Sequence, residues 1–349
     1  MEKKVFGVSK NKETAYLYRL TNKKGNYIEV TDFGACLVSV VVSDRNNRAV
    51  DVVLGYDDIS GYEDNPCYFG ATIGRNGNRL ENGQISILGK SYQLEQNEGS
   101  NNLHSGLNGY HKRMWELVSF EDDKITFALY SPNMDQGFPG EMKIKVTYEW
   151  DDEDTLTIHY EGESQEATWI NMTNHSYFNL GGHNSGSILN HNLQLQCDAY
   201  TPIKAENMIP TGEIKSVDGT AFDFREERKI GQRIDNEEEQ LIIAGGYDHN
   251  MVISDYQKAG GFKEFARCFC SDSGIGMTVS TDLPGVQFYA GNFITEILGK
   301  DKAKYNKRHG FCLETQYFPN AVNIENFESP LVDKEKKYYT KTSYSFFRE

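Results

Sequence analysis

Cysteine, proline and long apolar runs are scarce in this sequence. Its 349 residues include six cysteines and eight prolines, and no two cysteines have the CxxC spacing of a zinc ribbon or a redox pair. So few cysteines exclude a disulfide framework in a chain of this length, and we expect buried free thiols. No run of about 18 apolar residues occurs, and the first ten residues lack the apolar core of a signal peptide. These absences predict a cytoplasmic protein without a membrane span.

Positive charge is also in short supply. Lys and Arg number 36 against 51 for Asp and Glu, which gives a net charge of −15 spread along the whole chain. Such a surface repels phosphate polymers and anionic lipid. We therefore expect neither a nucleic-acid partner nor a membrane partner.

Alternation of apolar and polar residues with a period of two is what the sequence has in abundance. It is clearest in KITFALYS, MKIKVTYEW, TLTIHYEGE, NLQLQC and GMTVSTDLPGVQFYAGNF. This pattern is typical of strands with one buried face. Helical spacing is rare, and its best example, EEEQLIIAGG, is short. The sequence therefore predicts an all-β fold, a large antiparallel β-sandwich or barrel, and without repeats or linkers we expect residues 1–349 to form a single domain.

One motif imitates a phosphate-binding loop. SILGKSYQL contains Gly89, Lys90 and Ser91, but the required glycine is missing because position 84 is Gln. The flanking residues alternate like strands, so we expect a β-hairpin turn here.

Polar and titratable residues are concentrated in five short stretches. These are GRNGNRL (74–80), NNLHSG (101–106), TNHSYFNLGG (173–182), GGYDHN (245–250) and FCLETQYFPNA (311–321). Each stretch borders an alternating apolar segment, where a rigid sheet presents side chains to a pocket. Their titratable residues are Arg75, Arg79, His104, His175, Asp248, His249 and Glu314.

Two of these groups stand out from their local sequence. Glu314 lies within a strongly apolar strand, so its carboxylate is either paired there or has a raised pKa that suits a base. Asp248 and His249 are neighbours on a predicted strand, so their side chains point to opposite faces and at most one of them faces a shared pocket.

Several classes of chemistry lack their motifs. There is no HxH, HExxH or HxxxH spacing for a metal, no GxSxG for a serine hydrolase and no GxGxxG for a dinucleotide. We therefore expect no metal and no cofactor. An acid, a base, amides and aromatic rings remain, a set that suits a sugar: the rings stack on C–H faces, and polar groups bind the hydroxyls.

In this order, the five stretches resemble the aldose 1-epimerase family, also called the galactose mutarotases. The matching residues are Gly74, Arg75, Asn78, Arg79, Asn102, Leu103, His104, Gly106, Trp115, NHSYFNL (174–180), YDHN (247–250), PGVQFYAGNF (284–293) and LETQ (313–316). The resemblance runs from about residue 30 to the last predicted strand. It implies a single large β-sandwich, a monomer or homodimer, that interconverts the α and β anomers of a free aldohexose such as galactose or glucose.

The resemblance also implies the roles of seven residues. Glu314 would be the general base and His175 the general acid. The residues expected to bind the substrate are Asn78, Arg79, His104, Asp248 and Gln287.

This assignment makes chemical sense by itself. Anomerisation removes the proton of the C1 hydroxyl and protonates the ring oxygen, after which the ring opens, C1 turns and the ring recloses. We expect Glu314 and a protonated His175 to stand on opposite sides of the sugar and to contribute about 10² to 10⁴ in rate each. Asn78, Arg79 and His104 would stabilise charge on the ring oxygen. The amide and rings that flank His175 would orient its imidazole and line the sugar site.

The sequence departs from the family pattern at three positions. Ser105 stands where a second Gly is common, Tyr110 where Phe is common, and Asn320 where Asp is usual. None of them is a proposed acid or base. Because Ser105 adds a side chain beside His104, we expect it to affect substrate preference more than the reaction.

Three alternative functions remain open. A hexose-6-phosphate 1-epimerase would need cations around the phosphate, for which Arg75, Arg79, Lys112 and Arg113 are candidates. A non-catalytic sugar-binding protein would have lost the acid or the base, yet both are present. A glycosidase would need two facing carboxylates, and Asp248 with Glu314 could be read in this way.

Overall fold

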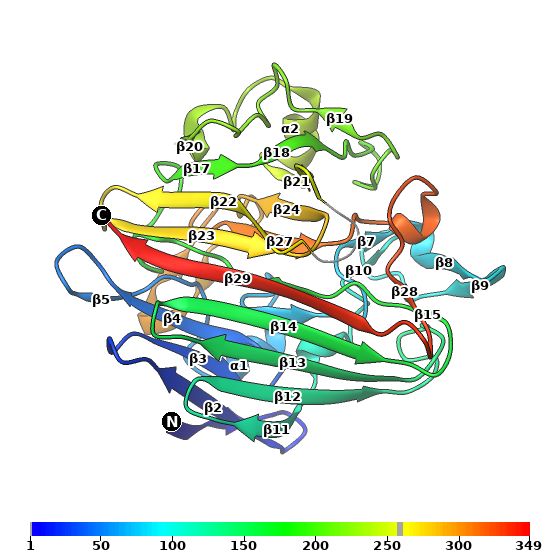
Figure 1. The fold of residues 1–349 in the computed structure, drawn as a ribbon, viewed down its shortest axis with the longest axis horizontal. Coiled ribbons are helices and arrows are strands. Elements are labelled where there is room, and N and C mark those ends of the chain that lie inside the picture. Colours follow the sequence, from blue (N-terminus) through cyan, green and yellow to red (C-terminus); the bar gives the residue numbers. More distant parts are fainter. Residues whose placement is uncertain (1, 257–260) are drawn as a thin grey trace.

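Three antiparallel sheets hold most of the strands (Figure 1). The computed structural model describes residues 2–256 and 261–349. The first sheet is a five-stranded meander of β1 (Glu2–Val8), β2 (Thr14–Thr21), β3 (Tyr27–Thr31), β4 (Leu37–Ser43) and β5 (Ala49–Asp51). The central sheet has the order β11 (Glu116–Phe120), β12 (Lys124–Ser131), β13 (Met142–Trp150), β14 (Thr155–Glu163), β29 (Tyr338–Arg348), β23 (Ile275–Thr281), β22 (Lys263–Cys270), β17 (Asn192–Leu195) and β20 (Arg228–Lys229). The third sheet is β19 (Lys215–Ser216), β18 (Cys197–Tyr200), β21 (Asp248–Ile253), β24 (Gly285–Tyr289) and β27 (Cys312–Gln316).

Short two-stranded ladders and two α-helices lie outside these three sheets. The ladders are β6 (Ala71–Ile73) with β16 (Thr173–His175), β7 (Arg79–Leu80) with β10 (Asn102–Leu103), β8 (Gln84–Ile87) with β9 (Lys90–Gln93), β15 (Thr168–Trp169) with β28 (Leu331–Val332), and β25 (Ile297–Leu298) with β26 (Lys304–Tyr305). The helices are α1 (Ile59–Asp64) and α2 (Glu239–Ala244). Neither helix is long and apolar enough to cross a bilayer.

The central sheet packs against both five-stranded sheets. Tyr18 of β2 meets Phe127 of β12 with ring centroids 5.6 Å apart, which joins the first sheet to the central one. Tyr344 of β29 donates a hydrogen bond of 3.2 Å to the carbonyl of Leu313 on β27, which joins the central sheet to the third. Buried apolar side chains from all three sheets form one continuous core. The prediction of an all-β antiparallel sandwich is therefore confirmed.

The period-two pattern predicted the strands of the central sheet well. Burial alternates along β13 as the sequence does, because one face packs on the core and the other meets solvent. SILGKSYQL forms the hairpin β8–β9, with Leu88 and Gly89 both at positive φ in its two-residue turn. The expected helix is α2, which ends at Gly245 in the left-handed conformation. Helix α1 was not predicted, because its sequence ISGYED has only two apolar residues, Ile59 and Tyr62, whereas α2 has four in a row.

The expectation of free thiols is confirmed for the six cysteines. Five of them are buried, and Cys67 is partly exposed.

Candidate active site

Three of the predicted site residues come from adjacent strands of the third sheet. Gln287 on β24 pairs with Glu314 on β27 on one side and with Asn250 on β21 on the other. Asp248 lies two residues before Asn250, so it projects from the same face as Gln287 and Glu314. The Gln287 amide donates a hydrogen bond of 2.7 Å to Asp248. Strand register alone thus brings these three side chains together.

Asn78, Arg79 and His104 come from the ends of the β7–β10 ladder, in which Arg79 is paired with Leu103. The backbone N–H of Asn78 donates to Nδ1 of His104 at 3.1 Å, and the N–H of His104 donates to the carbonyl of Asn78 at 3.1 Å. Because Nδ1 accepts a hydrogen bond, the neutral His104 ring carries its proton on Nε2. His104 is therefore held as a hydrogen-bond donor.

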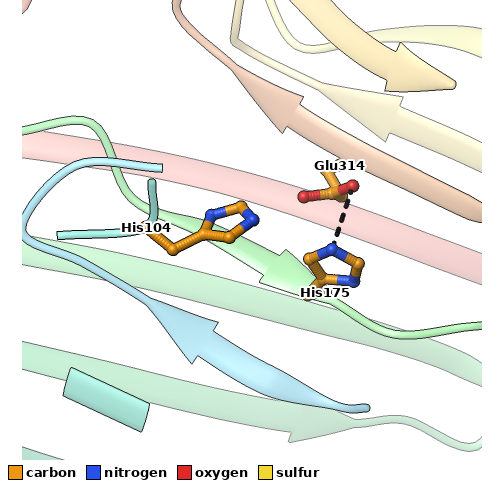
Figure 2. A group of neighbouring side chains, drawn as sticks. All are labelled: His104, His175 and Glu314. Carbon is orange, nitrogen blue, oxygen red and sulfur yellow. Dashed lines mark ion pairs between the residues drawn. The ribbon is translucent and has the colours of Figure 1, made fainter. Parts of the chain in front are cut away.

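His175 ends β16 and faces Glu314. Its Nε2 lies 3.6 Å from Oε1 of Glu314, and its Nδ1 lies 3.5 Å from the Cys312 thiol. Figure 2 shows His104, His175 and Glu314 pointing toward one another from three different elements. The His175 ring stacks on Tyr177 with centroids 5.0 Å apart and on Tyr68 with centroids 5.7 Å apart.

The residues flanking His175 only partly do what we expected of them. Tyr177 stacks on the imidazole and lines the pocket, as predicted. The Asn174 side chain accepts hydrogen bonds from Ser176 instead of touching the imidazole, and Phe178 packs in the core against Tyr344. The second ring that stacks on the imidazole is Tyr68, which lies outside the five polar stretches.

All seven predicted site residues line one cavity of about 190 Å³. The cavity is lined by Pro66, Cys67, Tyr68, Asn78, Arg79, Glu98, Leu103, His104, His175, Tyr177, Asp248, Gln287, Tyr289, Phe293 and Glu314. Aromatic faces and hydrogen-bonding groups therefore converge on the same space, as a sugar site requires. The prediction that His249 points away from Asp248 is confirmed, since its ring packs against Phe222 and its Nε2 lies 3.2 Å from the side-chain oxygen of Gln240.

Burial shifts the pKa values of Glu314 and His175 toward their neutral forms. It raises the pKa of Glu314 well above its ordinary value of 4.5, with the Asp248 charge adding to the rise and Arg79 opposing it. It lowers the pKa of His175 to about 4. The raised pKa of Glu314 agrees with our expectation, whereas the lowered pKa of His175 runs against the protonated imidazole that we expected. Desolvation is the largest cause of both shifts.

The relative position of the two groups also differs from our expectation. A gap of 3.6 Å cannot hold a sugar, so Glu314 and His175 do not stand on opposite sides of one. They lie side by side. This arrangement suits anomerisation, because both oxygens that exchange protons, the C1 hydroxyl and the ring oxygen, are bonded to C1.

Comparison with known proteins gives a single answer. The sequence pattern of the family described as aldose 1-epimerase matches residues 16–345. The chain belongs to the aldose 1-epimerase family. It is 40% identical to the galactose mutarotase of Bos taurus over 321 residues, 91% of this chain and 90% of the relative. It is 33% identical to the aldose 1-epimerase of Escherichia coli strain K12 over 335 residues, 95% of each chain.

A solved structure agrees with this family membership. The GalM/aldose epimerase homologue from C. elegans superposes with a TM-score of 0.88 at 29% identity, over 96% of this chain and 99% of that one. The fold class and the family named from the sequence motifs are both confirmed.

A metal ion does not fit this member of the family at the cluster of His104, His175 and Glu314. Their ligand atoms all lie within 4.8 Å of one another, so distance alone permits a site. However, a metal needs the lone pair of a histidine nitrogen. On His104 the Nδ1 lone pair is used by the Asn78 N–H, and Nε2 carries the proton. The donor set is therefore incomplete, which agrees with our expectation of no metal.

The cations expected for a hexose 6-phosphate are used elsewhere. Arg75 is buried and donates to the carbonyls of Pro139 and Gly140. Lys112 donates to the carbonyl of Glu63, and Arg113 pairs with Asp135. Among the residues that the structure describes, Arg79 is the one Lys or Arg that lines the cavity. This arrangement counts against the phosphosugar alternative.

The three departures from the family pattern lie outside the cavity. The Ser105 hydroxyl accepts from the N–H of Asn76 at 2.7 Å and lies 3.0 Å from its carbonyl, so it points away from the pocket. Tyr110 is buried against Trp115, and Asn320 accepts a hydrogen bond from the backbone of Glu81. Any effect of Ser105 on substrate preference must therefore act through its neighbour His104.

Sequence reasoning gave no role to seven residues of the described cavity wall: Pro66, Cys67, Tyr68, Glu98, Leu103, Tyr289 and Phe293. Tyr289 follows Gln287 by two positions on β24, so the alternation could have revealed it. Phe293 lies in the turn beyond β24, and Tyr68 and Glu98 lie in loops. Loops carry no period from which a facing direction could be predicted.

Proposed function

We propose that this chain interconverts the α and β anomers of free aldohexoses, with Glu314 as general base and His175 as general acid. The observation that carries this proposal is the pair itself. A buried carboxyl and a buried imidazole face each other at 3.6 Å in a cavity lined by sugar-binding groups. Family membership supports the same reaction.

Proton accounting explains how a pair that rests in its neutral form can work in both directions. The neutral pair, Glu314 protonated and His175 neutral, has the same number of protons as the ion pair. The ion pair opens the ring: Glu314 takes the C1 hydroxyl proton while His175 protonates the ring oxygen. The neutral pair that results closes the ring on either face of the aldehyde by the reverse transfers. No proton is lost to solvent over the cycle.

The other predicted residues would hold the sugar and stabilise charge on it. His104 offers its Nε2–H, and Arg79 offers guanidinium donors to an oxygen that becomes negative as bonds break. Asn78, Asp248 and Gln287 would bind hydroxyl groups. Tyr177 and Phe293 give the apolar C–H faces of the ring a surface to pack on.

Polarimetry tests the activity directly. Freshly dissolved α-D-galactose and α-D-glucose should approach their final rotation faster with enzyme than without, and the final rotation should be unchanged. Failure to accelerate any free sugar, together with acceleration of α-glucose 6-phosphate, would favour the phosphosugar alternative. Binding without acceleration of any sugar would favour a sugar-binding protein. Release of the leaving group from aryl glycosides would favour a glycosidase.

Glu314→Gln tests the proposed base. The substitution keeps the size of the side chain and removes its ability to take a proton, so we expect nearly all activity to be lost. Retention of more than about a tenth of the wild-type rate would rule Glu314 out as the base. His175→Asn should be similarly damaging, and His104→Gln less so if His104 only binds.

We further propose that the protein works in the cytoplasm, as a monomer or homodimer and without a nucleic-acid partner. The support is its net charge of −15, which disfavours anionic polymers and surfaces. Light scattering of the purified protein would give the oligomeric state.

A further inference from the structure

The guanidinium of Arg79 donates hydrogen bonds to Glu98 from one edge, and Arg79 also lines the cavity. Its Nε donates to Oε2 of Glu98 at 2.7 Å, and its Nη2 donates to Oε1 at 2.6 Å. This two-point pair occupies one edge of the planar group and two of its five N–H donors. Within residues 2–256 and 261–349 the remaining three N–H groups have no hydrogen-bond partner, and Arg79 lines the cavity. The free edge is thus available to a substrate.

Glu98 lies in a loop that backbone and side-chain hydrogen bonds hold in place. The backbones of Glu98 and Asn101 exchange two hydrogen bonds, of 3.2 and 2.9 Å. The Asn97 side chain accepts from the N–H of Leu103 and donates to its carbonyl. The loop that positions Glu98 therefore leads directly into β10 and His104, and these hydrogen bonds fix the backbone from which its carboxylate reaches Arg79.

Arg79 has a strong alternative to Glu98. The charge of Asp248 acts on it across the cavity. A released guanidinium would be drawn toward this carboxylate and into the space that the sugar needs.

We propose that Glu98 is the positioning and specificity-determining residue of this site: it aims Arg79 at the substrate, and by neutralising the cation it makes the cavity select neutral sugars over anionic ones. This inference rests on the proposed sugar-binding function and goes beyond it. The pairing of Glu98 with Arg79 also gives a physical reason why the cavity would reject sugar acids and sugar phosphates. Among the residues that the structure describes, Arg79 is the one Lys or Arg that lines the cavity and it is already paired, while the Asp248 carboxylate adds negative potential.

Glu98→Gln tests the proposal, with Glu206→Gln as the matched control. The amide retains the size of Glu98 but loses its charge and one of its two acceptors. Glu206 is an exposed carboxylate that lines the adjoining groove, and in the described part of the chain no hydrogen bond or ion pair joins it to Arg79, so its removal changes the local charge equally. kcat and KM are measured by polarimetry for D-galactose and for D-galacturonate, a hexose with a carboxylate at C6. The same two sugars are titrated calorimetrically.

Three results are expected. Glu98→Gln lowers kcat/KM for galactose by about tenfold or more, the usual size of a lost charge-assisted pair. It also raises the preference for galacturonate relative to galactose by about tenfold, since the freed cation can pair with the anion. In a chain that already has Arg79→Ala, adding Glu98→Gln has no further effect, because a residue that acts through Arg79 has nothing left to position.

Other outcomes would overturn the proposal. Additive losses from the two substitutions would show that Glu98 acts independently of Arg79. An unchanged ratio of the two sugars, or the same change in Glu206→Gln, would remove its role in specificity. If the wild-type protein anomerises no free sugar, the proposed function fails, and the calorimetric affinities for galactose and galacturonate still decide the role of Glu98.

Discussion

At the scale of single residues, one physical cause acts on both members of the proposed catalytic pair. Burial disfavours charge, so it raises the pKa of an acid and lowers that of a base, and Glu314 and His175 shift in opposite directions. At its ordinary pKa values of 4.5 and 6.5, a solvent-exposed pair would be an ion pair between those two pH values. Here both shifts favour the neutral pair, and the catalytic ion pair is its isomer with the same proton count.

We predict a broad bell-shaped dependence of kcat/KM on pH. As pH falls through about 4, His175 takes up a proton while Glu314 stays protonated. The pair then carries two protons, and its active form with one proton disappears. As pH rises through the raised pKa of Glu314, the pair loses its proton and activity falls again. Polarimetry between pH 3 and 10, corrected at each pH for the enzyme-free rate, measures the profile. An acid limb near 6.5, the ordinary pKa of histidine, would contradict the burial argument.

We also predict that Glu314→Gln stabilises the fold as pH rises. Below 4.5, the ordinary pKa of the carboxyl, Glu314 is protonated in both folded and unfolded chains and the substitution has no charge effect. Above 4.5 the unfolded chain releases this proton while the folded chain retains it, so the wild-type free energy of unfolding falls until pH passes the raised pKa. The glutamine variant escapes this loss. Thermal melts at pH 4 and pH 8 should show a difference in Tm that grows with pH, whereas a constant difference would show that the substitution acts only through packing.

At the scale of elements, the site depends on two kinds of support. The third sheet presents Asp248, Gln287 and Glu314 through strand register, which fixes their spacing. The β7–β10 ladder presents Asn78, Arg79 and His104 through a network of hydrogen bonds in its loops. Ser105 ties these loops together because its hydroxyl bonds to both the N–H and the carbonyl of Asn76.

We predict that Ser105→Ala is more damaging than Ser105→Gly. Both variants lose two hydrogen bonds at a buried position, each worth about 1 kcal/mol. Ser105 has a φ of +67°, so glycine also relieves backbone strain of roughly 1 kcal/mol while alanine retains it. Urea unfolding should therefore show a loss of about 2 kcal/mol for alanine and about 1 kcal/mol for glycine. KM should rise more than kcat falls in both, because the loop orients His104; equal stability of the two variants would contradict the strain argument.

The sequence determined some of these elements more clearly than others. The bounds of β12, β13 and β14 coincide with the alternating segments, because one face of each strand is buried and the other is wet. Every residue of β24 is buried, since one face of the strand meets the core and the other meets the cavity. In this strand the polar residues face the cavity, so they indicate a functional site and not a solvent-exposed face. Glu98 and Tyr68 were missed because loop residues face a cavity only through tertiary contacts. The lowered pKa of His175 was missed for a similar reason: it results from burial, and Tyr68 and Cys312, which contact the ring, lie far from it in the sequence.

At the scale of the whole molecule, the central sheet joins everything else. Its buried side chains form the largest apolar cluster with side chains of both five-stranded sheets, and the described residues also form two smaller clusters. We propose on this basis that residues 1–349 unfold as a single domain.

Calorimetry tests this proposal. We expect one transition with a heat-capacity change of about 4 to 5 kcal/mol/K, the value for a chain of this length that unfolds completely. The calorimetric and van't Hoff enthalpies should agree. Two resolved transitions would show that separate parts of the chain unfold independently.

The position of β29 has a consequence for biosynthesis. This strand, drawn in red across the middle of Figure 1, lies between β14 and β23 and hydrogen-bonds to both. A ribosome makes β14 well before β29, and at 5 to 20 residues per second the interval is roughly 10 to 35 s. Throughout that time the inner edge of β14 lacks its partner, and the two halves of the central sheet cannot join. The nascent chain therefore carries open strand edges until almost all of it has been translated, and this is the stage at which chaperones would have the most to protect.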